Sequence, residues 1–414
     1  ASPAVLRDGR ILYTRWEYID KGAVSVKCLW AMMPDGSGSA EIYGNDIALP
    51  PTMLYGRPIP GREGKYVMLG TPHCPQNGMG TVIKLDMTRN IRSREPMNYV
   101  TADVDIRAEA GFHFLIDGHW KRDGSGRAGR LFKEPYPLSG REFLVAYKPA
   151  GVCWKDPAAY HLALLDEKGG VEVIHEDPEM SCFEPFPLQA RERPPVLRGA
   201  MDPELAESGM ATCVVTDVYH GLTGIQRGEA KFIRINRQIP RYWSARRNWD
   251  GDCYDQQHAV VSKDASLGLR VQEGIVPVEE DGSAHFLVPA NANIFFQVLD
   301  ENYMELQRER TFVNYLPGET RTCVGCHETP EEVSPPGHST PLALRRPPSV
   351  PGPQPGEKSG RRTLFYERDV QPVFDRHCVE CHRPEKKEGD FDLSGTRTEW
   401  FNVSYESLMP ERRR

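Results

Sequence analysis

Pairs of short predicted strands, each closed by a polar turn, recur through the first 190 residues and constrain the fold more than any other feature. RILYTRW at residues 10–16 is followed by VKCLWAMM at 26–33 and the turn PDGSG, and REFLVAYKP at 141–149 precedes YHLALLDEKGGVEVIHED at 160–177. Units of about 40–50 residues built this way are typical of β-propeller blades. We therefore predict a mainly β fold, with a partial β-propeller over residues 1–190.

The number of these units bears on how the propeller closes. Three copies are visible, the second and fainter one lying between residues 62 and 87. A closed propeller needs about four to eight blades, and an open stack of three leaves unpaired strand edges at both ends. We expect the chain to begin inside a propeller that belongs to a longer protein; the alternative is a small irregular β domain.

A second strand-rich region follows a Pro- and Arg-rich connector. Within it, Val-Pro-Val and His-Phe-Leu-Val flank Asp281-Gly282, a dipeptide typical of hairpin turns. We expect residues 191–333 to form a β-sandwich middle domain, in which these two strands pair as a hairpin.

The last part of the chain differs in composition. Residues 334–362 are rich in Pro and Gly, as in an extended linker. The stretch YERDVQPVFDRHC then predicts a helix, because Val370, Val373 and Phe374 fall on one helical face. Residues 363–414 are therefore expected to form a small α-helical C-terminal domain.

Composition excludes two classes of partner. The formal net charge is −7, which gives no electrostatic reason to bind nucleic acid. No run of 18 apolar residues occurs, so we predict no membrane span.

Two CxxCH motifs carry the predicted chemistry. Two cysteines at this spacing can form thioethers with the vinyl groups of haem, and the adjacent histidine can then bind the iron. We predict two covalently attached haem c groups, held by these residues: Cys323, Cys326 and His327 for the first, and Cys378, Cys381 and His382 for the second. Such attachment takes place outside the cytosol, so a periplasmic or other extracytoplasmic location is expected, although no signal peptide is visible in this chain.

Zinc is the competing interpretation of the same cysteines. Cys323, Cys326, Cys378 and Cys381 could together form a four-thiolate site. The separation between the two pairs is longer than the roughly 15–20 residues usual in zinc ribbons, which favours haem.

The segment that ends in the first motif, GIVPVEEDGSAHFLVPANANIFFQVLDENYMELQRERTFVNYLPGETRTCVGCHE, resembles the hydrazine synthase alpha subunit family. The stretches ILYTRWEYIDKG, MSCFEPFPLQARERPP and DVYHGL resemble the same family, and DVQPVFDRHCVECH is similar to planctomycete-type cytochrome c domains. The resemblance implies a TolB-like propeller, a hydrazine synthase alpha middle domain and a cytochrome c domain, in that order.

The resemblance also implies an unusual first haem site. In that family the motif histidine binds a nearby zinc, and a tyrosine just beyond the motif binds the iron. On this chain His327 would be the zinc ligand, with Cys182 and His220 as tentative further ligands. No tyrosine follows His327 directly, however, so a plain bond from His327 to iron remains the alternative.

For the second haem, Met409 is the one methionine after His382, and no histidine follows it. Either the cytochrome domain continues beyond this chain or the distal ligand lies elsewhere.

These observations predict a redox enzyme or electron-transfer subunit that acts on a small species, such as a nitrogen compound. A hydrazine synthase-like oxidoreductase is one form of this hypothesis, and no individual catalytic residue is identified. The expected partners are a redox protein or other subunits of a complex, together with a small-molecule substrate. The alternatives are a non-catalytic electron-transfer or scaffold protein, and a zinc-stapled structural protein without haem.

Overall fold

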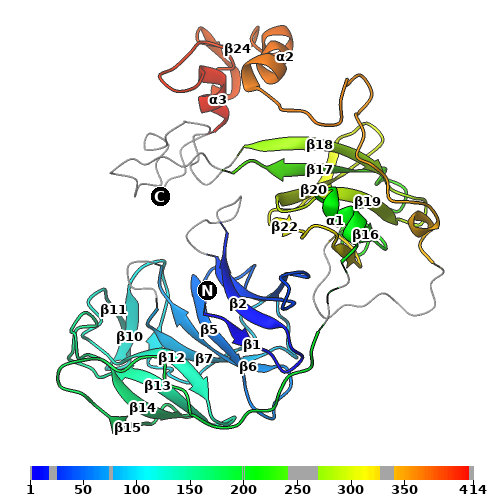
Figure 1. Cartoon of the computed structure of the whole chain (residues 1–414). Coiled ribbons are helices and arrows are strands. Elements are labelled where there is room, and N and C mark those ends of the chain that lie inside the picture. Colours follow the sequence, from blue (N-terminus) through cyan, green and yellow to red (C-terminus); the bar gives the residue numbers. More distant parts are fainter. Residues whose placement is uncertain are drawn as a thin grey trace. The chain divides into compact units, whose positions relative to one another are not determined.

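The computed structural model describes residues 2–17, 26–73, 78–197, 199, 201–240, 269–326 and 340–409, and its described part is mainly β, as predicted (Figure 1). Two compact units are present, one formed by the described residues up to Met201 and the other by those from Asp202 onward. No helix within the described ranges is long and apolar enough to cross a membrane.

The first unit consists of antiparallel strand groups of the kind that form propeller blades. Strands β1 to β8 form an eight-stranded sheet in the order β1-β2-β3-β5-β6-β7-β8, with β4 paired to β3. Their bounds are β1 (Ala4–Val5), β2 (Ile11–Trp16), β3 (Lys27–Met32), β4 (Ala40–Tyr43), β5 (Thr52–Pro58), β6 (Lys65–Thr71), β7 (Thr81–Asp86) and β8 (Met97–Tyr99).

A separate four-stranded sheet, ordered β12-β13-β14-β15, corresponds to the third predicted repeat. A small sheet of β9, β10 and β11 is inserted before it, where the repeat pattern is interrupted. The bounds are β9 (Val104–Asp105), β10 (Phe112–Ile116), β11 (His119–Asp123), β12 (Leu131–Pro137), β13 (Glu142–Lys148), β14 (His161–Asp166) and β15 (Val171–His175).

Neighbouring strand groups of the first unit are joined by apolar cores. Leu12, Leu29 and Met68 belong to one cluster of buried side chains, which joins strands β2 and β3 to β6. Val82 and Phe143 belong to another, which joins β7 to β13. Burial of about 25 cal/mol per Å² of apolar surface makes these clusters the main source of stability between successive blades.

The second unit begins with a β-sandwich. One sheet is ordered β19-β16-β23 and the other β18-β17-β20-β21, with β22 paired to β20. The bounds are α1 (Pro203–Glu207), β16 (Met210–Val215), β17 (Phe232–Gln238), β18 (Arg270–Pro277), β19 (Ala284–Pro289), β20 (Asn293–Leu299), β21 (Glu305–Arg308), β22 (Val313–Asn314) and β23 (Thr320–Cys323). Side chains such as Phe286 from the first sheet and Ile235 from the second meet in one buried core.

The predicted hairpin around Asp281-Gly282 is wrong. Strands β18 and β19 flank this turn, but they belong to different sheets of the sandwich. The amide of Gly282 donates to the carbonyl of Glu279, and the carbonyl of Gly282 accepts from the amide of Val218. The turn therefore carries the chain from one sheet to the other, and the Asp-Gly pair does not distinguish this crossing from a hairpin.

The described part of the Pro-rich segment lies along the sandwich. After the short helix η2 (Leu342–Arg345), backbone bridges join Ser349 to Phe286, Gly352 to Ile275 and Arg362 to Gln272. The extended segment thereby covers strands from both sheets.

Short elements make up the rest of the chain, and they include a helix where one is predicted. They are the π-helical turn η3 (Tyr366–Val370), α2 (Gln371–His377), β24 (His382–Arg383), β25 (Lys386–Lys387), η4 (Glu388–Asp390) and α3 (Val403–Leu408). Gln371 is buried, and its carboxamide bonds the carbonyl of Leu393 at 3.0 Å and the hydroxyl of Ser404 at 2.6 Å. A polar network of this kind holds α2 and α3 together.

Candidate haem-attachment sites

The first motif leaves the sandwich at the end of strand β23. This strand runs parallel to β16, with Cys323 opposite Val215. Beyond the strands, the amide of Thr216 donates to the carbonyl of Cys323 at 2.9 Å, and the amide of Asp217 donates to that of Val324 at 3.0 Å. The backbone of the motif is therefore fixed to the chain that follows β16.

Gly325, between the two cysteines, lies against His220. A Cβ atom added at Gly325 would lie 2.4 Å from the carbonyl oxygen of His220 and 2.6 Å from its Cβ atom. Real Cβ atoms do not approach backbone this closely, so the loop needs glycine at this position. The structure thus brings His220, one of the tentative zinc ligands, next to the first motif.

Both cysteines of the first motif line one small apolar cavity. Its volume is about 30 Å³, and it is lined by Cys323, Cys326, Gly325, Val215, Ile233, Phe296, Val298, Gln307, Arg308 and Glu309. The two cysteines also pack against the buried core of the sandwich.

The lining of this cavity agrees with haem attachment in the kind of residue it offers. Apolar walls suit a porphyrin edge, the two thiols suit its vinyl groups, and Arg308 is a suitable partner for a propionate. A volume of about 30 Å³ is close to that of one water molecule, so a haem attached to these cysteines would lie mostly outside this cavity.

Two further buried polar groups lie beside Cys323, and the sequence interpretation missed their proximity. Cys213 is fully buried on β16, and Tyr315 is 1% exposed. A hydrogen bond with the Cys323 thiol, together with burial, raises the pKa of the Cys213 thiol well above its usual value. Burial likewise raises the pKa of Tyr315. Alternation along β16 could have placed Cys213 in the core, whereas no sequence signal places Tyr315 there.

The second motif lies at the end of helix α2. Cys378 caps the helix, and its amide donates to the carbonyl of Phe374 at 2.8 Å. The amides of Cys381 and His382 both donate to the carbonyl of Cys378, at 3.1 Å and 3.0 Å. This tight turn brings the two cysteines and the histidine of the motif close together in space.

His382 has an unsatisfied ring nitrogen. Its Nδ1 atom is buried and has no hydrogen-bond partner among the described residues. A buried polar atom without a partner costs about 1–3 kcal/mol. An imidazole in this state is compatible with a role as ligand, so the residues of the second motif fit a haem group.

The surroundings of the second motif contain little buried apolar surface. Among the described residues from 363 onward, Leu393 is the one buried apolar side chain. The predicted apolar face of the helix is covered only in part: Val370 and Phe374 are half-buried, whereas Val373 is 53% exposed. Other large apolar side chains are exposed as well: Leu364, Phe365, Phe391, Trp400 and Leu408.

The remaining zinc hypothesis concerns residues in separate parts of the chain. Cys182 belongs to the first unit, where its amide donates to the carbonyl of Tyr160, and His220 belongs to the second. His327 lies outside the described residues. Within the described ranges, no three His, Cys, Asp or Glu side chains gather into a group that could hold a metal ion, and the four motif cysteines form no such group.

Comparison with known proteins extends this description. Residues 228–328, which include both cysteines of the first motif, match the family model of the hydrazine synthase alpha subunit middle domain. The chain is hydrazine synthase alpha-like in its middle domain. The structure titled Kuenenia stuttgartiensis hydrazine synthase resembles the chain with a TM-score of 0.69 and 18% sequence identity. No curated protein sequence matches.

The structural likeness covers nearly all of one of the two chains but only part of the other. It covers 99% of this chain but 59% of the Kuenenia chain. At 18% identity, this likeness supports the fold of the chain alone. The region that matches the family model ends at the first motif, where the cavity lies.

Proposed function

We propose that this chain is part of an extracytoplasmic dihaem c-type protein related to the hydrazine synthase alpha subunit. The observation that carries the proposal is the convergence of Cys323 and Cys326 on one apolar cavity, in the domain that matches the family. A second CxxCH motif in a helical C-terminal region supports two haem groups rather than one.

The first site is the candidate reaction centre. Cys323 and Cys326 would hold the haem, and the sandwich would fix their positions through the backbone bonds of β16 and β23. Bound there, haem iron supplies redox chemistry toward a small ligand, and the surroundings of the iron decide whether that ligand can reach it. His327 would bind either the iron or a zinc ion together with His220.

The second site is the candidate electron-transfer centre. Cys378 and Cys381 would hold the haem, and His382 would bind its iron. Exposed apolar side chains around this motif, such as Phe365 and Trp400, would pack against the porphyrin or a redox partner. Other subunits of a complex, or a separate redox protein, would exchange electrons here.

The test is spectroscopic and uses the full chain matured in a host that exports and attaches c-type haem. We expect a Soret band and a reduced spectrum typical of haem c, with carbon monoxide binding to the iron of the first site. Haem that is low-spin at both sites and binds no carbon monoxide would favour the non-catalytic electron-transfer alternative. A colourless protein would overturn the proposal.

A further inference from the structure

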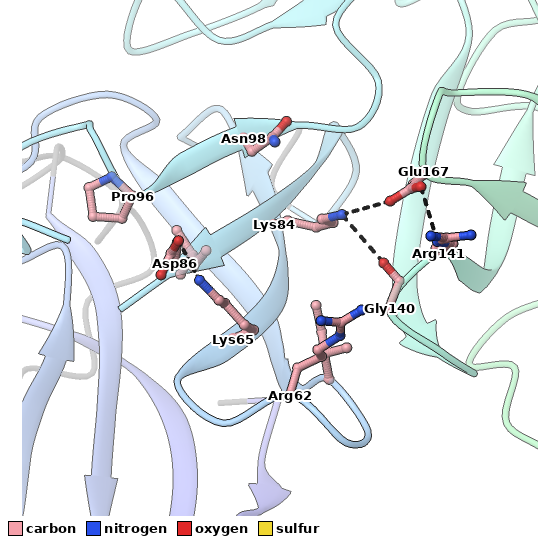
Figure 2. A pocket seen from close by; sticks show the side chains of 11 residues that line it. Arg62, Lys65, Lys84, Asp86, Pro96, Asn98, Gly140, Arg141 and Glu167 are labelled. Atoms are coloured by element: carbon pink, nitrogen blue, oxygen red, sulfur yellow. Dashed lines mark hydrogen bonds and ion pairs between the residues drawn. The ribbon is translucent and has the colours of Figure 1, made fainter. Parts of the chain in front are cut away.

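A polar pocket in the propeller unit lies outside both motifs. It has a volume of about 340 Å³ and is lined by Ile59, Arg62, Lys65, Lys84, Leu85, Asp86, Pro96, Asn98, Gly140, Arg141 and Glu167 (Figure 2). These residues come from β6, β7 and β8 and from turns that precede β6 and that join β12 to β13 and β14 to β15. Pockets that bind small molecules usually measure about 300–1,000 Å³, so this one is large enough for a small ligand.

Positive charge exceeds negative charge on the pocket wall. Four of the lining side chains are cationic, namely Arg62, Lys65, Lys84 and Arg141, and two are anionic, namely Asp86 and Glu167. Lys65 pairs with Asp86. The pKa of Asp86 is lowered, mainly by a hydrogen bond from Lys65. The Asp86 carboxylate therefore stays ionised and paired with Lys65.

Glu167 is shared between two cations. Its carboxylate lies 3.2 Å from Lys84 Nζ and 3.5 Å from Arg141 Nε, as the dashed lines in Figure 2 mark. Lys84 also donates to the carbonyl of Gly140 at 3.4 Å. One carboxylate cannot neutralise two cations, so this side of the pocket keeps an unbalanced positive charge.

Arg62 adds a second unbalanced cation. Its side chain forms no ion pair or hydrogen bond with any residue in the described part of the chain, and its Nε atom is 3.5 Å from the position a Cβ atom would take at Gly140. Its guanidinium therefore lies beside the backbone that also binds Lys84. The Asn98 carboxamide, on the wall opposite in Figure 2, likewise has no hydrogen-bond partner among the described residues.

We propose that this pocket binds a carboxylate group on a short aliphatic skeleton. Arg62 would bind the carboxylate through its paired N–H groups, with Lys84 and Arg141 adding positive charge. Ile59, Leu85 and Pro96 would contact the carbon skeleton. A planar carboxylate suits the guanidinium of Arg62, and the excess of two positive charges on the wall offsets the charge of a mono- or dicarboxylate.

The carboxylate could belong to a free small acid or to an acidic side chain of a partner protein. Isothermal titration of the full chain with succinate tests the first source, and a blocked tripeptide with a central glutamate tests the second. Succinamide, which has the same skeleton without charge, serves as the neutral control for both.

We expect saturable binding of succinate or of the glutamate peptide, and none of succinamide. Arg62→Met should weaken this binding at least about tenfold, the loss typical of one charge-assisted pair. Arg127→Met, which removes an exposed arginine of the same unit outside the pocket, should leave the affinity unchanged. Arg62→Lys keeps the positive charge but lacks the two parallel N–H groups of arginine, so its affinity should lie between those of these two variants.

Preferential binding of succinate would assign the site to a free acid, and preferential binding of the peptide would assign it to a partner protein. Absence of saturable binding by either probe would overturn the proposal. Equal affinity in wild type and in a folded Arg62→Met variant, with folding checked by thermal unfolding, would overturn it as well.

Discussion

The two CxxCH motifs share the same spacing but lie in very different surroundings. Cys323 and Cys326 pack against the buried core of a two-sheet sandwich, and their loop is bonded to the chain after β16. Cys378 and Cys381 follow a short helix, and among the described residues from 363 onward Leu393 is the one buried apolar side chain. The motif thus defines the covalent chemistry, and the surrounding fold determines whether the region around the motif stays folded without haem.

The largest expected difference follows from removing the haem at each motif in turn. Replacing both Cys378 and Cys381 by alanine should leave the C-terminal region largely unfolded, because about 50 residues without an apolar core are rarely stable alone. The matching change at Cys323 and Cys326 should leave the sandwich folded. Hydrogen exchange read by mass spectrometry measures both, and full protection of α2 and α3 in the first variant would contradict the comparison.

A second prediction concerns the residue before the second cysteine of each motif. Gly325→Ala should displace the first loop, because the added Cβ atom meets the carbonyl of His220, and overpacking of this kind costs about 1–3 kcal/mol. We expect less haem on the first motif, measured from the attached peptide. Glu380→Ala occupies the same position in the second motif and is the matched control. It should not change attachment, since Glu380 lies at an open turn.

The pH dependence of the sandwich provides a third, smaller test. In the haem-free protein, the pKa of Cys213 is raised in the folded state, so the neutral thiol stabilises the fold. This contribution is complete below the ordinary thiol pKa of about 8.5 and decreases above it by at most about 1.4 kcal/mol per pH unit. Urea unfolding at several pH values should show this loss in the wild type and a weaker one in Cys213→Ala. Identical slopes would exclude a role for the thiol.

The smallest expected effects compare the loss of one or two side-chain carbons in the two regions. Ile235→Val, in the sandwich core, should lower the free energy of unfolding by about 1 kcal/mol. Val373→Ala, on the exposed face of α2, should change the stability of the haem-free protein by less than about 0.5 kcal/mol. If urea unfolding showed that both variants lose the same free energy of unfolding, the C-terminal region would have a core of its own.

Much of the fold could be predicted because strand alternation and polar turns are local signals. The strands around REFLVAYKP and the helix before Cys378 both follow from short-range patterns. The Asp281-Gly282 turn could not be assigned, because a hairpin and a crossing between sheets use the same turn residues. Sheet membership depends on long-range packing, which a local pattern does not contain.

The candidate sites show the same limit. CxxCH spacing identified the cysteines, but it could not reveal that Gly325 contacts His220 or that Cys213 and Tyr315 are buried beside Cys323. His220 and Cys213 are each about 100 positions from the motif residue that they contact, and the parallel pairing of β16 and β23 brings them together. Likewise, helical periodicity predicted the helix around Val373, but it could not show that the Val373 side chain is 53% exposed.

The most direct test of covalent haem attachment at both motifs is peptide mass spectrometry of the full chain after maturation in an export-competent host. The account predicts that the peptide containing Cys323 and Cys326 and the peptide containing Cys378 and Cys381 each carry one haem through two thioether bonds. Recovery of both peptides without haem, with all four thiols free or bound to zinc, would contradict it.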